Sequence, residues 1–182
     1  MSKKTGVLIV NLGTPDSPAT SDVKRYLSEF LNDPRVIDIN PIGRKVLVNG
    51  IIVPTRGPKS AKEYKKLFKI GDGASPLLTY GKNLLKLVRK IGHKQFDVEL
   101  AMRYGNPSMN SILEKMRLAN YDQIIIFPLY PQYASATTGS IIEKAFKIIS
   151  KWWVIPEIKV IGQFYDDYRY LDCVKKVASS FD

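Results

Sequence analysis

Residues 127–140 read Phe127-Pro128-Leu129-Tyr130-Pro131-Gln132-Tyr133-Ala134-Ser135-Ala136-Thr137-Thr138-Gly139-Ser140, and we call them the crest loop. The apolar run Ile124 to Phe127 leads into this loop, and an apolar-periodic helix leaves it near Gly139. The pattern predicts a strand-loop-helix unit, and in open α/β sheets ligands bind at such carboxyl ends of strands. The crest loop carries aromatic and hydroxyl side chains but no charge, His or Cys. It therefore favours holding a flat apolar ligand over acid–base catalysis.

Three further apolar runs predict strands at residues 6–11, 96–102 and 157–161, beside the strand at 123–127. The first run is continuous rather than alternating, which is typical of a strand buried on both faces. Helical periodicity separates the strands, and this alternation indicates a parallel sheet with right-handed crossovers. We therefore expect an α/β, Rossmann-like fold with a four-stranded parallel sheet flanked by helices.

Capping chemistry predicts where the helices begin and end. The start signals are Thr20 or Ser21, Asn106 before Pro107, a capping box of Ser140 and Glu143, and Asp166 or Asp167. The stop signals are Asp33-Pro34 and Gly92. On two of these helices the side chains expected to face a core are Leu84, Leu85, Val88, Ile91, Met109, Ile112, Leu113 and Met116.

Residues 35–76 are expected to form a long irregular insertion. Three prolines and three glycines, Pro41, Pro54, Pro58, Gly43, Gly50 and Gly57, break this segment into short pieces. We predict a basic helix over 60–68 and a loop over 71–76. Long insertions of this kind are more often functional than idle.

The net charge of +11 is concentrated between Arg44 and Lys69, where Glu63 is the one acidic residue. An acidic ligand or an anionic membrane surface would fit this charge, and so would solvated helix faces with no ligand. No basic run is dense enough to resemble a nucleic-acid-binding arm, so we expect no nucleic-acid partner.

Cys173 is the single cysteine, which fits a reducing compartment, and its helical neighbours indicate a buried, inert thiol. The apolar run 7–10 is too short for a signal-peptide core, and no segment reaches the ~20 apolar residues that span a bilayer. We expect a soluble, cytoplasmic chain.

The carboxyl ends of the predicted strands place residues 12–14, 103–105 and 129–131 around one cleft. Arg103 could pair with a ligand carboxylate or form a structural ion pair, and both interpretations stay open. The tyrosines of the cleft could hold a flat ligand or pack as core. The single His93 is expected at the opposite edge of the sheet. With no His/Cys cluster and no nearby acid other than Asp16, the cleft is expected to bind a ligand without supplying a metal site or a general base.

Five segments together resemble the ferrochelatases, which insert ferrous iron into protoporphyrin IX in the last step of haem synthesis. They are residues 10–15, 31–37, 73–77, 102–107 and the crest loop, and the resemblance runs in order along essentially the whole chain. It implies a lyase with two similar Rossmann-like, chelatase-like domains and the porphyrin between them. Ferrous iron is then a substrate, and no resident cofactor is implied.

The resemblance assigns substrate-binding roles to several residues. Leu12 would contact the macrocycle, Ser75 would lie near the ring edge, and Arg103 and Tyr104 would line the inner pocket. The crest-loop residues assigned to the cleft wall are Tyr130, Ser135, Thr137 and Thr138. Residues 35–69 would form an apolar lip that can associate peripherally with the inner membrane.

The resemblance covers the N-terminal half of the family's length. The family's catalytic His, in a Ser-x-His-x-x-Pro motif, and its acidic partner would lie beyond Asp182, so no catalytic residue is assigned within this chain. We expect residues 1–164 to form one domain and 165–182 to begin a second, truncated one. The 182 residues alone are expected to bind porphyrin weakly, without catalytic activity, and can dimerise through an exposed domain interface. Protoporphyrin and coproporphyrin both remain open as substrates.

Other classes of protein fit the sequence less well. A non-catalytic α/β ligand-binding module of the flavodoxin type would need phosphate-binding turns, yet Gly13 alone follows the first strand. A cobalt chelatase acting on sirohydrochlorin would place a His at a strand end that faces the cleft. A basic nucleic-acid binder would show a steep dependence of binding on salt.

Overall fold

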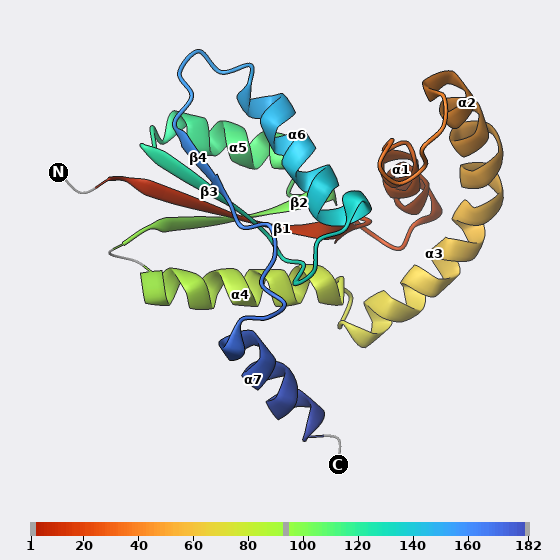
Figure 1. The fold of residues 1–182 in the computed structure, drawn as a ribbon. Coiled ribbons are helices and arrows are strands. Elements are labelled where there is room, and N and C mark those ends of the chain that lie inside the picture. Colours follow the sequence, from red (N-terminus) through yellow and green to blue (C-terminus); the bar gives the residue numbers. More distant parts are fainter. Residues whose placement is uncertain (1–2, 93–94, 181–182) are drawn as a thin grey trace.

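The computed structural model describes residues 3–92 and 95–180. Its four strands form one parallel sheet in the order β2-β1-β3-β4 (Figure 1). The strands are β1 (Thr5–Thr14), β2 (Asp97–Gly105), β3 (Gln123–Pro128) and β4 (Glu157–Val160). This architecture confirms the predicted fold. The main difference is that β1 and β2 each run three residues further than expected, to Thr14 and Gly105.

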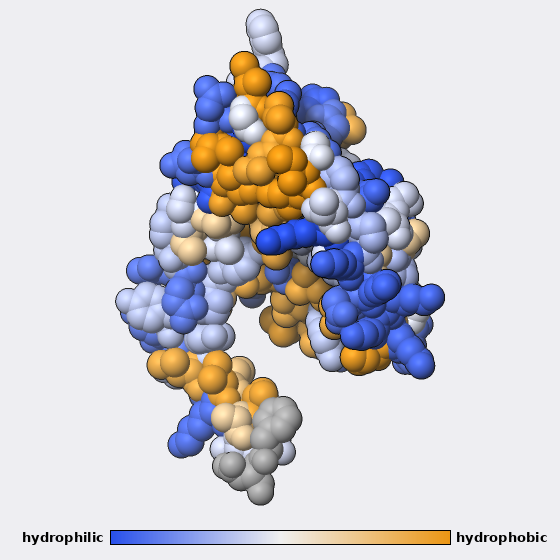
Figure 2. Space-filling model, turned by 90° about the vertical axis from the view of Figure 1, so that its right-hand side faces the viewer, coloured by the Kyte–Doolittle hydropathy of each residue, from blue (hydrophilic) through white to orange (hydrophobic). Residues whose placement is uncertain are grey.

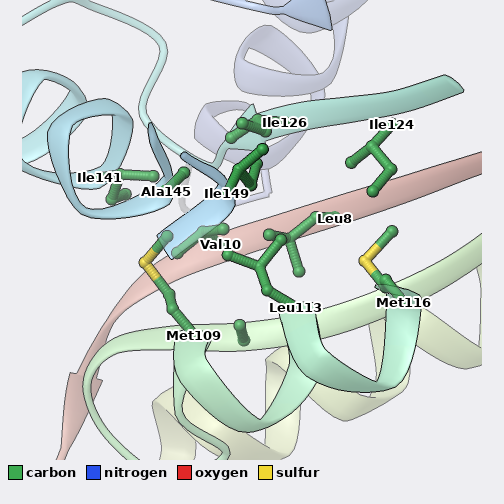
Figure 3. Packing of buried hydrophobic residues seen from close by; sticks show 11 residues of the cluster. Leu8, Val10, Met109, Leu113, Met116, Ile124, Ile126, Ile141, Ala145 and Ile149 are labelled. Atoms are coloured by element: carbon green, nitrogen blue, oxygen red, sulfur yellow. The ribbon is translucent and has the colours of Figure 1, made fainter. Parts of the chain in front are cut away.

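Helices cover both faces of the sheet, which explains the continuous apolar run of β1. One face packs against α5 (Met109–Leu118) and α6 (Ser140–Ile149), and Figure 3 shows Leu113 of α5 directed toward Leu8 and Val10 of β1. The other face packs against α4 (Pro76–Gly92). Leu85 and Val88 of α4 contact this core as predicted, but Leu84 and Ile91 are exposed.

Three of the predicted helix caps are wrong, although α1 does begin at Thr20. No side chain caps α1 (Thr20–Leu31) at Ala19; the Ser17 hydroxyl instead accepts from the Ala19 N–H at 3.1 Å and donates to Asp22. The cap of α5 is Ser108 rather than Asn106.

Ser140 forms no capping box, since α6 continues directly from a π-helical turn, η2 (Ser135–Gly139). The carboxylate of Glu143 instead pairs with Arg35. Asp167, one of the two predicted residues, does cap α7 (Tyr168–Ala178).

The segment expected to be irregular is largely helical. It contains α2 (Pro41–Lys45), the π-helical segment η1 (Val46–Ile52) and α3 (Val53–Ile70), which follow one another as the long curved arc in Figure 1. Pro41 is tolerated because it is the first residue of α2, where the missing N–H has no partner to lose. Pro54 is the second residue of α3 and directly follows the π-helical segment η1. Only Pro58 falls inside a helix, and α3 is curved in Figure 1.

Aromatic side chains connect this arc to the sheet. The rings of Tyr64 on α3 and Tyr26 on α1 meet edge to face, with centroids 6.0 Å apart. Phe30 on α1 then meets Tyr104 of β2 at 5.1 Å. The arc is therefore held near the carboxyl ends of the strands.

None of the residues of α7 is buried, and Cys173 on this helix is exposed. The prediction of a buried thiol is wrong, because the apolar side of α7 contacts no core in the described part of the chain. The division between residues 1–164 and 165–182 stays a prediction. Within 3–92 and 95–180, the helices are all too short or too polar to cross a bilayer.

Candidate functional site

The carboxyl ends of β1, β2 and β3 meet as predicted. Gly13 lies opposite Tyr104 in the parallel register, and the Leu129 N–H donates to the Val10 carbonyl at 2.8 Å. Gly13 has a φ of +110°, and a Cβ placed there would lie 1.8 Å from the Tyr104 carbonyl oxygen. Only glycine allows β1 and β2 to approach this closely at the site.

The centre of the site is the carboxylate of Asp33, which follows α1. One of its oxygens accepts from the Tyr104 hydroxyl at 2.7 Å, from the Ser140 hydroxyl at 2.5 Å and from the Arg103 guanidinium. The other oxygen accepts from the Arg35 N–H at 2.8 Å. These contacts join the end of α1, the end of β2 and the start of α6, and we call the four residues Asp33, Arg103, Tyr104 and Ser140 the Asp33 hub.

Asp33 is held ionised although it is buried. Burial by itself would raise the pKa of its carboxyl, but hydrogen bonds from Ser140, Tyr104 and the Arg35 N–H, with the charge of Arg103, hold that pKa below its usual value. A carboxylate stabilised in this way is a poor proton acceptor near neutral pH. The hub is therefore a structural charge cluster rather than a general base.

Of the two interpretations of Arg103, the structure contains the structural ion pair. Its guanidinium pairs with Asp33, its Nε donates to the Ser140 hydroxyl at 2.7 Å, and its Cζ lies 4.4 Å from the centre of the Tyr104 ring. The Tyr104 side chain is fully buried. Burial raises the pKa of Tyr104, so its hydroxyl stays protonated and donates to Asp33.

The crest loop is anchored from outside by Arg35. This guanidinium donates to the Ser135 hydroxyl at 3.1 Å and pairs with Glu143 on α6. Within the loop, the Thr137 and Gly139 N–H groups both donate to the Ala134 carbonyl, at 3.2 and 3.1 Å. The loop is thus closed on itself and tied to the segment that follows α1.

Two hydroxyls of the predicted site are buried with no hydrogen-bond partner in the described part of the chain, those of Tyr130 and Thr138. Burial raises the pKa of Tyr130, and the neighbouring Tyr104 hydroxyl raises it further. Tyr130 also packs against the core that underlies α6. Its hydroxyl is therefore directed into the protein.

The remaining predicted residues lie around this centre with different exposure. Leu12 and Thr137 are half-buried, Ser135 is exposed, and Ser75 is buried just before α4. Arg103 stacks directly on the Tyr104 ring, whereas Ser75 makes no side-chain hydrogen bond to the other predicted residues among 3–92 and 95–180. His93 lies outside the described residues.

Sequence reasoning missed the role of Asp33, which it used only as the stop signal of a helix, and of Arg35 and Ser140. The one available signal was that residues 31–37 form part of the family resemblance. Behind the hub lies an open groove of about 460 Å³ that includes Lys45, Lys144 and Lys147 in its lining. Burial and then the charge of Arg103 lower the pKa of Lys144.

Comparisons with known proteins agree on one family. A family model described as ferrochelatase matches residues 4–180. A ferrochelatase from Francisella tularensis subsp. tularensis (strain WY96-3418) is 42% identical over 174 residues, covering 95% of this chain and 52% of the relative. One from Chromobacterium violaceum is 40% identical over 172 residues, covering 92% of this chain and 47% of the relative. The chain thus spans about half the length of the curated relatives it matches.

Proposed function

The chain belongs to the ferrochelatase family, and from this premise we propose that it serves the insertion of ferrous iron into a porphyrin, a lyase reaction of haem synthesis. In that reaction two pyrrole protons leave the ring and the nitrogens turn their lone pairs toward the metal. Ferrous iron enters as a substrate. We assign to these 182 residues one wall of the porphyrin cleft.

The Asp33 hub is the observation that carries this proposal. Three of the segments that resemble the family, residues 31–37, 102–107 and the crest loop, meet at one buried carboxylate. A buried, fully hydrogen-bonded charge cluster holds such segments rigidly. A rigid wall can keep a bound macrocycle bent, because the ring cannot flatten without displacing packed backbone.

Within this wall the assigned residues have different parts. Leu12, Tyr130, Ser135 and Thr137 would contact the ring, and Ser75 would lie near its edge. Thr138 is fully buried and would support the crest loop from within. Arg103 and Tyr104 would shape the inner pocket as positioning residues, since their polar groups are already engaged with Asp33.

We propose that the 182 residues bind porphyrin without turning it over. The Asp33 carboxylate is held ionised by its partners, so it is unsuited to remove pyrrole protons. Titration with protoporphyrin should change the porphyrin absorbance, while a zinc-insertion assay should show no product. Turnover of zinc, or a porphyrin spectrum that does not change, would contradict the proposal.

The hub's part in binding can be tested with one matched pair of variants. Asp33→Asn should weaken porphyrin binding by about tenfold, the equivalent of ~1.4 kcal/mol. Glu114→Gln removes an exposed carboxylate that pairs with Arg117 rather than with the hub, and should leave binding unchanged. Equal porphyrin affinities for the two variants would show that the hub does not contribute to porphyrin binding.

We also propose peripheral contact with the inner membrane from the cytoplasmic side, through α2 and η1. Ile42 and Val46 are 76% and 64% exposed there. Figure 2 shows hydrophobic side chains gathered on the upper part of the face that carries this arc, with hydrophilic ones below. Lys45 adds positive charge that suits anionic headgroups. Ile42→Ser combined with Val46→Ser should lower binding to anionic vesicles.

A homodimer is the remaining proposal. The apolar side chains of α7 are exposed, including Leu171, Val174 and Val177, and a second copy could cover them. Light scattering should give the mass of two chains at micromolar concentration. Val174→Glu should return the protein to a single chain, and a wild-type monomer would refute the proposal.

A further inference from the structure

The connection between α6 and β4 exposes an unusual set of apolar side chains. It reads Trp152-Trp153-Val154-Ile155-Pro156, and we call it the tryptophan loop. Trp153 is 101% exposed, Val154 75% and Ile155 54%. Trp152, in contrast, packs against the core below α6, so the loop is held in place from one side. Three adjacent apolar residues on an anchored loop indicate a contact surface rather than scattered exposure.

Acidic and basic side chains both lie near this loop, and Asp122 and Glu157 line the same groove as Trp153. Lys147 and Lys151 precede the loop, are exposed and have no ion-pair partner among residues 3–92 and 95–180. The nearby acid Glu157, in contrast, pairs with Lys3. The apolar tip is thus preceded by cations that no neighbouring acid neutralises.

The tryptophan loop lies away from the candidate site. It precedes β4, so it belongs to the edge of the sheet opposite the strand ends that form the cleft. In Figure 1 the loop and α2 both lie at the upper end of the molecule. Figure 2 is turned about the vertical axis, so each part of the molecule has the same vertical position as in Figure 1. The hydrophobic patch in Figure 2 also lies at the upper end.

We propose that the tryptophan loop inserts into the interfacial layer of an anionic bilayer and forms a second membrane contact. An indole with an apolar body and an N–H favours the headgroup region, and the lysines before it favour anionic lipids. The inference rests on the membrane contact proposed for α2 and η1, but different residues carry it. The two contacts lie toward the same end of the molecule.

A second copy of the chain fits the same loop less well. A symmetric contact through the loop would bring Lys147 and Lys151 close to their own copies, which opposes association. An anionic surface instead satisfies the lysines and the apolar tip together.

Vesicle binding of the full 182-residue chain tests the proposal. Wild-type protein should sediment with vesicles of phosphatidylcholine and phosphatidylglycerol, and much less with pure phosphatidylcholine. Comparison of wild type with Trp153→Phe isolates the emission of Trp153. On anionic vesicles this emission should shift to the blue, and its quenching by acrylamide should fall by roughly threefold as the indole leaves water.

Substitutions separate the loop from the other contact. Trp153→Ser combined with Val154→Ser should lower vesicle affinity by roughly tenfold. Leu87→Ser, at an exposed apolar residue of α4 on the other face of the sheet, should change nothing. Thermal unfolding of each variant confirms that the fold is retained.

The outcomes distinguish the two membrane contacts. If the protein binds vesicles while acrylamide still quenches Trp153 fully, the loop inference is overturned and the contact through α2 and η1 stands. If the protein binds no vesicle, both fail. If Trp153 becomes shielded only as protein concentration rises, without lipid, a second copy covers the loop and the inference fails.

Discussion

Ser140 donates a hydrogen bond of 2.5 Å to a carboxylate oxygen of Asp33, which lies 107 positions earlier in the chain. The same oxygen accepts from Arg103 and Tyr104. The start of α6, the end of β2 and the segment after α1 therefore share one acceptor atom. A substitution that removes this charged oxygen therefore weakens the contacts of all three segments together.

Asp33→Asn should strongly destabilise the protein. The substitution keeps the shape of the side chain but leaves the Arg103 guanidinium buried without its counter-ion, which costs about 3 kcal/mol of unfolding free energy. Urea denaturation measures this loss. Glu114→Gln breaks an exposed pair and should have a much smaller effect. Similar losses for both variants would mean that the hub is no more important than a surface pair.

The hub should also make stability depend on pH. The pKa of Asp33 is lower in the folded protein than its unfolded value of about 3.9. Its contribution is therefore complete above that unfolded value and is lost as pH falls through the folded pKa. The stability difference between wild type and Asp33→Asn should shrink as pH is lowered below about 4. A difference that stays constant with pH would show that Asp33 titrates normally.

Gly13→Ala and Gly43→Ala should act in opposite directions. At Gly13 a Cβ meets the Tyr104 carbonyl and φ is positive, so alanine should cost about 2 kcal/mol or more of unfolding free energy. At Gly43, inside α2, a Cβ meets nothing within 4 Å, so alanine should stabilise by about 0.5 kcal/mol or more. Thermal unfolding of both variants would reveal the contrast, and a shift of the same sign in both would refute it.

Replacing Tyr104 or Tyr130 by phenylalanine should have different effects on stability. Tyr104→Phe removes a buried hydrogen bond to a carboxylate and should lower stability by about 1.5–3 kcal/mol. Tyr130→Phe removes a buried hydroxyl that has no partner in the described part of the chain, so stability should stay equal or rise. Chemical denaturation of each variant gives the comparison. A large loss in Tyr130→Phe would mean that this hydroxyl has a bound water as its partner.

Cys173 should react in the folded protein when the chain is dilute enough to be monomeric. The thiol is exposed on α7, so a disulfide reagent should modify it at a rate within a few-fold of that in urea. Protection by a large factor would mean that another chain or segment covers α7. The dependence of such protection on protein concentration would identify a second copy.

The strands could be predicted from the sequence because their cause is local. Continuous apolar runs such as 6–11 are stable only when both faces of the strand are covered, and that requirement can be read in a few adjacent residues. The convergence of the strand ends then follows from the topology alone. The same reasoning placed Arg103 and Tyr104 at the cleft.

The hub could not be predicted, because its cause is not local. Asp33 beside Pro34 indicates a helix end, and nothing near it reveals that its partners lie 70 and 107 positions away. The arc from Pro41 to Ile70 was wrongly expected to be irregular for a related reason. Proline disfavours a helix interior, but here α3 and η1 pack against α1, and no local pattern in the sequence reveals that contact.

The π-helical turn η2 makes the number of residues in the crest loop as important as their identity. Such a turn holds one residue more than an α-helical turn, and each residue rotates a helix by about 100°. Deletion of a single residue between Ala134 and Ser140 would therefore rotate the Ser140 hydroxyl away from Asp33. Across relatives that keep this hub, insertions and deletions should be rarer in this short turn than substitutions.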